Sequence, residues 1–101
     1  MEQEIFEIIS HAGDSRGYAY EALDAAENKD FTEAETLMKK AEEELGLAHN
    51  TQTKLIQSEI NGQDIKMSLL MIHAQDKLMT AISENALIGK MIKMYRNLYE
   101  K

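Results

Sequence analysis

Hydrophobic residues in the first quarter of the chain recur at helical spacing. Between about Glu2 and Asn28 they follow one another mostly at steps of three and four, along one face. Gly13 and Gly17 lie in the middle of this segment, and each weakens a helix by up to about 1 kcal/mol relative to alanine. The pattern predicts a long amphipathic helix, with these apolar positions on its packed face: Ile5, Ile8, Ile9, Ala12, Ala19, Ala22, Leu23 and Ala26.

A second helix is predicted from Asp30 to about Gln57. Asp30 is a good N-cap, and Glu33 stands three residues later, where it would complete a capping box. Steps of three and four alternate along the segment, and this spacing is typical of a seam that packs against other helices. The seam has one polar member, Gln52, and consists of Phe31, Ala34, Met38, Ala41, Leu45, Ala48, Gln52 and Leu55.

The last third of the chain combines a polar loop with a long apolar helix. Residues 58–66 form the predicted loop, with Asn61-Gly62 as its turn. The third helix is expected from near Met67 to about Tyr99, a length of roughly 50 Å. Its apolar residues spread over about 200° of the circumference, and they are Leu70, Met71, Ile72, Ala74, Leu78, Met79, Ala81 and Ile82.

So wide an apolar arc predicts packing on two sides of the third helix. One side would contact the chain's own bundle, and the other a copy of the chain or another partner. The alternative is an unusually buried central helix. Either way, the three segments predict an all-α fold, an antiparallel three-helix bundle with short connections, as one domain over residues 1–101.

Composition narrows the functional classes. The formal net charge of -7 disfavours nucleic-acid binding, which needs a basic surface, and also disfavours anionic membranes. The absence of cysteine from the sequence excludes disulfide and thiol chemistry. The N-terminus lacks the features of a signal peptide, and no apolar run approaches the roughly 20 residues that span a bilayer. We therefore expect a soluble, cytoplasmic protein.

A compact polar strip lies beside the apolar arc of the third helix. It consists of His73, Asp76, Lys77, Thr80, Ser83 and Glu84. Asp76 and Lys77 follow His73 by three and four residues, so both neighbour it on the helix surface. A neutral imidazole is a competent nucleophile in group transfer, and Lys77 would screen the charge of a phosphoryl group. Asp76 would repel that group unless a cation or a hydrogen bond neutralised it.

Spacing alone leaves the role of His73 open. A histidine close to an aspartate on a helix is more often part of a surface ion pair or hydrogen bond. His73 and Asp76 are also spaced as two metal ligands, but zinc sites usually have three or four, which His11 or His49 would join only through the fold. Glycine-rich phosphate loops and G-x-S-x-G nucleophile motifs are absent from the sequence.

Longer segments of the sequence resemble one protein family. Residues 71–80, MIHAQDKLMT, closely resemble the V-H-A-Q-D-H-L-M-T segment of the lactose/cellobiose/chitobiose IIA components of sugar phosphotransferase systems (PTS). Residues 8–16, IISHAGDSR, are similar to the family's I-I-S-H-A-G-D-A-R. Residues 30–35, 48–56 and 68–70 resemble its G-D-F-E-E-A-E step, its A-H-x-x-Q-T-x-L-I segment and its serine-leucine entry to the last helix. These blocks cover nearly the whole chain in the family's order.

The resemblance implies a fold, an activity and a set of partners. Members of the family are three-helix bundles that associate as homotrimers with nine helices. His73 would accept a phosphoryl group from the histidine-containing phosphocarrier protein, as tele-phosphohistidine, and pass it to a cysteine of the IIB component. The IIB and membrane IIC components would phosphorylate a sugar, typically a disaccharide, during its uptake. Asp76 would point to the trimer axis and bind a divalent cation, typically Mg²⁺, and Gln75 would support the phosphorylation site.

One residue departs from the family's pattern, and the sequence is also compatible with two other functions. Lys77 stands where the family usually has a second histidine, and lysine keeps a positive charge there but is no proton acceptor at neutral pH. The turn at residues 25–34 also resembles the corners of tetratricopeptide-like hairpins, which would make the chain a non-enzymatic interaction module. A regulatory IIA paralogue is the other alternative. The module does not explain residues 73–80.

Overall fold

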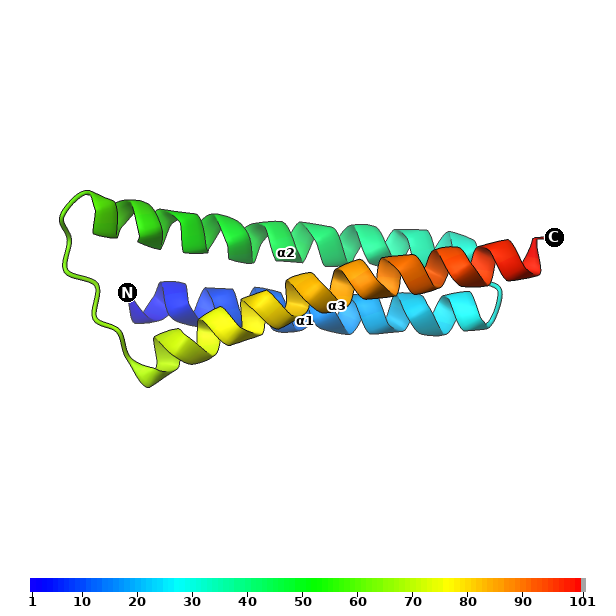
Figure 1. Cartoon of the computed structure of the whole chain (residues 1–101), viewed down its shortest axis with the longest axis horizontal. Coiled ribbons are helices and arrows are strands. Elements are labelled where there is room, and N and C mark those ends of the chain that lie inside the picture. Colours follow the sequence, from blue (N-terminus) through cyan, green and yellow to red (C-terminus); the bar gives the residue numbers. More distant parts are fainter. Residues whose placement is uncertain (101) are drawn as a thin grey trace.

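The chain forms three α-helices in a computed structural model that describes residues 1–100. They are α1 (Glu2–Glu27), α2 (Phe31–Ile60) and α3 (Leu69–Tyr99), and the described residues contain no strand. α1 and α2 make an antiparallel hairpin, and α3 crosses it obliquely in the same direction as α1 (Figure 1). α3 packs mainly against α1. The all-α prediction is confirmed, while the expected domain span of 1–101 includes Lys101, which lies outside the described residues.

A Schellman turn joins α1 to α2. The Lys29 N–H donates to the Ala26 carbonyl at 3.0 Å and the Asp30 N–H to the Ala25 carbonyl at 2.9 Å. Asp30 then caps α2, as predicted, by accepting from the Glu33 N–H at 3.1 Å. The other half of the predicted capping box is wrong, because the Asp30 N–H already donates to the carbonyl of Ala25.

Lys29 occupies the left-handed position of this turn, with φ of 65°. A side chain there costs about 1–2 kcal/mol relative to glycine. The Lys29 ammonium also lies 4.8 Å from the centre of the Tyr99 ring, a contact worth about 0.5–1 kcal/mol at an exposed site. We therefore expect Lys29→Gly to raise the free energy of unfolding by about 0.5–1 kcal/mol, measured by urea denaturation. Lys29→Ala is the control, since it loses the ring contact without relieving the backbone, and equal stability of the two variants would contradict the prediction.

The second connection differs from its prediction at both ends. α2 continues to Ile60, beyond the predicted end at Gln57, and stops in another Schellman turn with Gly62 at φ 93°. The Gln63 N–H bonds the Ser58 carbonyl across this turn, so residues 58–60 belong to the helix and not to the loop. The chain then crosses the end of the hairpin to reach α3 (Figure 1).

α3 begins at Leu69, two residues later than the predicted start near Met67. The Ser68 hydroxyl caps the helix by accepting from the Met71 N–H at 3.1 Å. Serine is a strong N-cap because its oxygen satisfies one of the first free N–H groups of a helix. The Ser68 cap therefore fixes the start of α3 at Leu69, four residues before His73.

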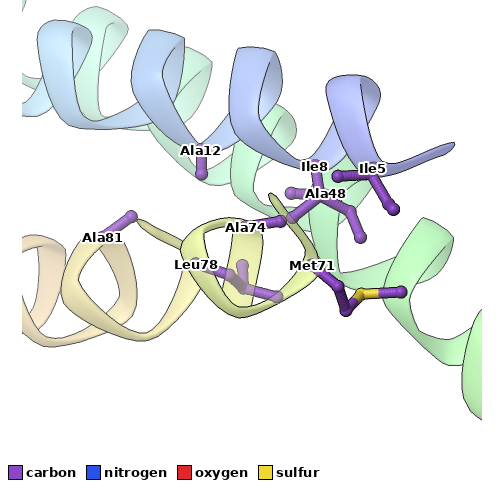
Figure 2. Close-up of a cluster of buried hydrophobic side chains, with 8 residues drawn as sticks. All are labelled: Ile5, Ile8, Ala12, Ala48, Met71, Ala74, Leu78 and Ala81. Carbon is purple, nitrogen blue, oxygen red and sulfur yellow. The ribbon is translucent and has the colours of Figure 1, made fainter. Parts of the chain in front are cut away.

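The core consists of two apolar clusters, one toward each end of the bundle. Figure 2 shows the cluster at the end where α3 begins, to which all three helices contribute. The second cluster surrounds Ile88 and Ile92 of α3. Every residue of the predicted seams on α1 and α2 is buried or half-buried, which confirms both patterns. Most buried apolar positions are alanines, and their small side chains let the helix backbones approach closely.

A buried polar chain lies between the two clusters. The Ser15 hydroxyl donates to the Ala41 carbonyl at 2.6 Å, and the Asn85 amide donates to the Ser15 oxygen at 2.7 Å. Ser15 is fully buried and Asn85 is 7% exposed. These two bonds connect α1, α2 and α3 at one level, and nothing in the local sequence pattern predicted them.

Candidate functional site

The candidate site lies on the exposed side of α3, in its second and third turns. His73 and Asp76 are exposed and Lys77 is half-buried. Met71, Ala74 and Leu78, which alternate with them, are buried and fix this part of α3 against the bundle. A packed inner face and an exposed outer face give His73 a rigid base and free access to a docking protein. The structure thus brings His73, Asp76 and Lys77 together on one surface, as the spacing predicted.

The apolar arc of α3 divides into an inner and an outer face. Ile72 is 47% exposed and Met79 is 59% exposed, although both belong to the arc. Asp76 lies between them, four residues after Ile72 and three before Met79. The alternative of a central helix buried on all sides is therefore wrong for the single chain. An exposed apolar stripe of this kind is typical of a surface that contacts another protein.

The polar strip continues from Lys77 to Glu84, where α1 contributes to it. The Arg16 Nε donates to the Glu84 carboxylate at 2.8 Å, and the Arg16 guanidinium lies 4.9 Å from the centre of the Tyr20 ring. Hydrogen bonding by the Tyr20 hydroxyl, the largest effect, lowers the pKa of Glu84, against an opposing effect of burial. Arg16 and Lys77 lower this pKa further. Sequence reasoning found Glu84 but missed Arg16 and Tyr20, because only the packing of α1 on α3 brings them there.

Gln75 lies apart from this strip within the chain. It is half-buried, and Gln52 of α2 donates its amide hydrogen to the Gln75 side-chain oxygen. Gln75 is two residues after His73, which places the two about 200° apart around α3. The structure therefore places Gln75 on the side of α3 away from the strip, and it does not bring Gln75 to His73 in one chain. It also explains the polar seam position, since Gln52 has a partner on α3.

Metal-binding clusters and membrane-spanning helices are both absent from the part of the chain that the structure describes. Residues 1–100 contain no cluster of three or more histidine, aspartate or glutamate side chains placed to hold a metal ion. His11, considered above as a zinc ligand, instead lies with its Nδ1 2.5 Å from the Glu44 carboxylate. Within the same part of the chain, no helix has the length and apolarity needed to cross a membrane. Asp76 is the carboxylate that each chain presents between the exposed apolar side chains of Ile72 and Met79.

The sequence matches known proteins over almost its entire length. Residues 3–96 match the model of the family described as PTS system, lactose/cellobiose specific IIA subunit. The chain is 45% identical to the lichenan-specific phosphotransferase enzyme IIA component of Bacillus subtilis, over 101 residues that make up 100% of this chain and 92% of the relative.

Solved structures agree with these sequence matches. The chain is similar to the cellobiose-specific enzyme IIA from Bacillus anthracis, with a TM-score of 0.95, 43% identity and coverage of 99% of this chain and 92% of that one. It is also similar to the chitobiose IIA in the solution structures of the IIA–HPr complex of Escherichia coli, with a TM-score of 0.83, 34% identity and coverage of 97% and 95%. The chain therefore belongs to the lactose/cellobiose-specific IIA family of the phosphotransferase system.

Proposed function

We propose that the chain carries phosphoryl groups on His73, between a histidine-containing phosphocarrier protein and the cysteine of a IIB component. The observation that carries this proposal is the exposure of His73 on a firmly packed helix of a IIA protein. The chitobiose IIA structures, solved as a complex with HPr, support a phosphocarrier protein as the donor. The chain would act in the cytoplasm, in the uptake of a disaccharide of the lactose/cellobiose/chitobiose class.

The chemistry requires little from the protein beyond access and position. The tele nitrogen of neutral His73 would attack the phosphorus of the donor's phosphohistidine with its lone pair. A P–N bond forms at His73 while the donor's P–N bond breaks, and the electron pair of that bond returns to the donor imidazole. In the second step a thiolate of IIB attacks the same phosphorus, a P–S bond forms, and the P–N bond to His73 breaks. Positioning and charge stabilisation dominate such transfers.

Lys77 and Gln75 would assist from two directions. Lys77 lies one turn after His73, within about 6 Å between Cβ atoms, where its ammonium would screen the added phosphoryl charge. Gln75 is on the far side of α3, so it would support the site of a neighbouring chain across a subunit boundary. Its oxygen already accepts from Gln52, which leaves its amide hydrogens free to donate to a phosphoryl oxygen.

The exposed stripe of α3 is proposed as the interface of a homotrimer. Three chains related by a threefold axis would bury Ile72 and Met79 and bring three copies of Asp76 together. Like charges in such a site repel, and a divalent cation such as Mg²⁺ prefers carboxylate oxygens as ligands. The Asp76 carboxylate that each chain presents between Ile72 and Met79 fits such a shared structural ion better than a metal site within one chain.

We expect light scattering at micromolar concentration to give a mass near three times that of the 11.5-kDa chain. Chelation of divalent cations should lower the stability of this assembly, because the three carboxylates would then repel. Asp76→Leu should remove that dependence while retaining the trimer, and Asp64→Leu in the exposed loop is the matched control that should keep it. A monomer at this concentration would refute the interface.

The function is tested by incubating the chain with phosphoenolpyruvate, enzyme I and the phosphocarrier protein. We expect one acid-labile phosphoryl group per chain, mapped by mass spectrometry to His73 and transferable to a IIB protein. Absence of uptake with an active phosphocarrier protein would refute the function, and uptake at another residue would refute the site.

A further inference from the structure

Lys77 is placed to reach two anionic groups on the same strip of α3. It follows His73 by one turn and precedes Glu84 by two, at axial distances of about 6 and about 10 Å. Around the helix, Lys77 lies within about 40° of both His73 and Glu84. The flexible four-carbon stem of lysine therefore lets one ammonium approach either a phosphoryl group on His73 or the carboxylate of Glu84.

Glu84 already has a counter-ion of its own. The Arg16 Nε lies 2.8 Å from its carboxylate, and the Glu84 side chain is 26% exposed, so this pair is partly shielded from solvent. The packing of Arg16 against the Tyr20 ring keeps the guanidinium at this place. A carboxylate that is already paired attracts a second cation less strongly than a free one. Arg16 would therefore weaken the attraction of Glu84 for Lys77.

From this arrangement, and on the basis of the proposed function, we infer that the Arg16–Glu84 pair is a positioning device that leaves Lys77 available to phosphorylated His73. Before transfer, Glu84 attracts the Lys77 ammonium electrostatically, because the two lie on the same polar strip. Phosphorylation adds negative charge at His73, and Lys77 moves toward it because Arg16 keeps Glu84 neutralised. Arg16 is a positioning residue only, since it lies level with Glu84, about 16 Å along α3 from His73 and beyond the screening length at physiological salt.

The device depends on a lysine at this position. A histidine at this position would be shorter and mostly neutral near pH 7, so a carboxylate two turns away would hold it weakly. A lysine carries a permanent charge that Glu84 would capture in the absence of Arg16. The pairing with Arg16 therefore compensates for a consequence of Lys77 itself.

The test measures the equilibrium between the phosphorylated chain and the phosphorylated phosphocarrier protein. We expect Arg16→Gln to lower the phosphorylated fraction of the chain, expressed as an equilibrium constant, about threefold, the size of a partly exposed charge interaction. Arg16→Lys should retain most of the wild-type value. The double variant Arg16→Gln/Glu84→Gln should return to the wild-type value or above, because residue 84 then no longer competes for Lys77.

Two controls separate this role from a structural one. Arg96→Gln removes another Arg–Glu pair between helices, with Glu35 at 3.0 Å near the far end of α3, and should leave the equilibrium constant unchanged. In a Lys77→Ala background, Arg16→Gln should have no further effect. An unchanged constant in Arg16→Gln, or an equal loss with and without Lys77, would overturn the inference. The function itself would still stand as long as the wild-type chain takes up phosphate at His73.

Discussion

His73→Ala should take up no phosphoryl group from the phosphocarrier protein, whereas the wild-type chain should take up one. The substitution removes the attacking nitrogen, and no neighbour on the strip has the nucleophilicity of a neutral imidazole. His73 is exposed, and alanine is the best helix former, so fold and stability should be unchanged. Intact-mass spectrometry after incubation with the donor system measures the uptake, and circular dichroism verifies the helices.

His49→Ala is the matched control for this prediction. His49 is also an exposed histidine within a helix, but it belongs to α2 and is absent from the polar strip. Its replacement should leave phosphate uptake at the wild-type level. Uptake by His73→Ala, or its loss in His49→Ala, would place the acceptor elsewhere.

Leu78→Ala should lower the free energy of unfolding by about 3–4 kcal/mol, toward the upper part of the range for buried leucines. Leu78 is fully buried in the cluster of Figure 2, among Ile8, Ala74 and Ala81. Alanines have no flexible side chain that can move into the space left behind, so most of the cavity should persist. Urea denaturation at matched protein concentration measures the change.

Leu47→Ala makes the same chemical change on the surface of α2. Leu47 is 47% exposed, so its truncation should cost less than about 1 kcal/mol. If the two variants lost equal stability, Leu78 would not have the packing role that we assign to it.

The seams of the bundle were predictable from the sequence because burial repeats with the helical period. Even Gln52, the polar member of the α2 seam, proved half-buried, through its bond to Gln75. The wide arc of α3 likewise divided into buried Ala74 and Leu78 and exposed Ile72 and Met79. The helical period of the apolar residues contains this information, because these residues gather on the side of each helix that is packed away from water.

Contacts between residues that are far apart in the sequence cannot be read from the local hydrophobic period. Asn85 and Ser15 are 70 residues apart, and Arg16 and Glu84 are 68 apart. The flanking sequence of each residue gives no sign of its partner, and only the packing of α3 on α1 brings the partners together. The end of α2 at Ile60 was missed for a related reason, since a helix extends until its capping bonds close and polar residues alone do not end it.

The role of His73 depended on a different kind of information. Spacing placed Asp76 and Lys77 beside it but did not distinguish a phosphoryl acceptor from an ordinary surface histidine. The motif in residues 71–80 made that distinction, and membership of the IIA family supports it. The structure adds that the side chain is exposed on a helix whose inner face is firmly packed.

The chain of hydrogen bonds from Asn85 through Ser15 to Ala41 also fixes how far the helices slide along one another. Buried alanines recur every seven residues on α2 and at Ala74 and Ala81 of α3, so a shift of α3 by two turns, about 10.5 Å, would set small side chains against small side chains again. The same shift would separate Asn85 from Ser15 and leave buried polar groups unpaired, at a cost of about 1–3 kcal/mol each. This polar level thus prevents α3 from sliding along α1. It keeps Glu84 opposite Arg16 and holds His73 at one height along the bundle.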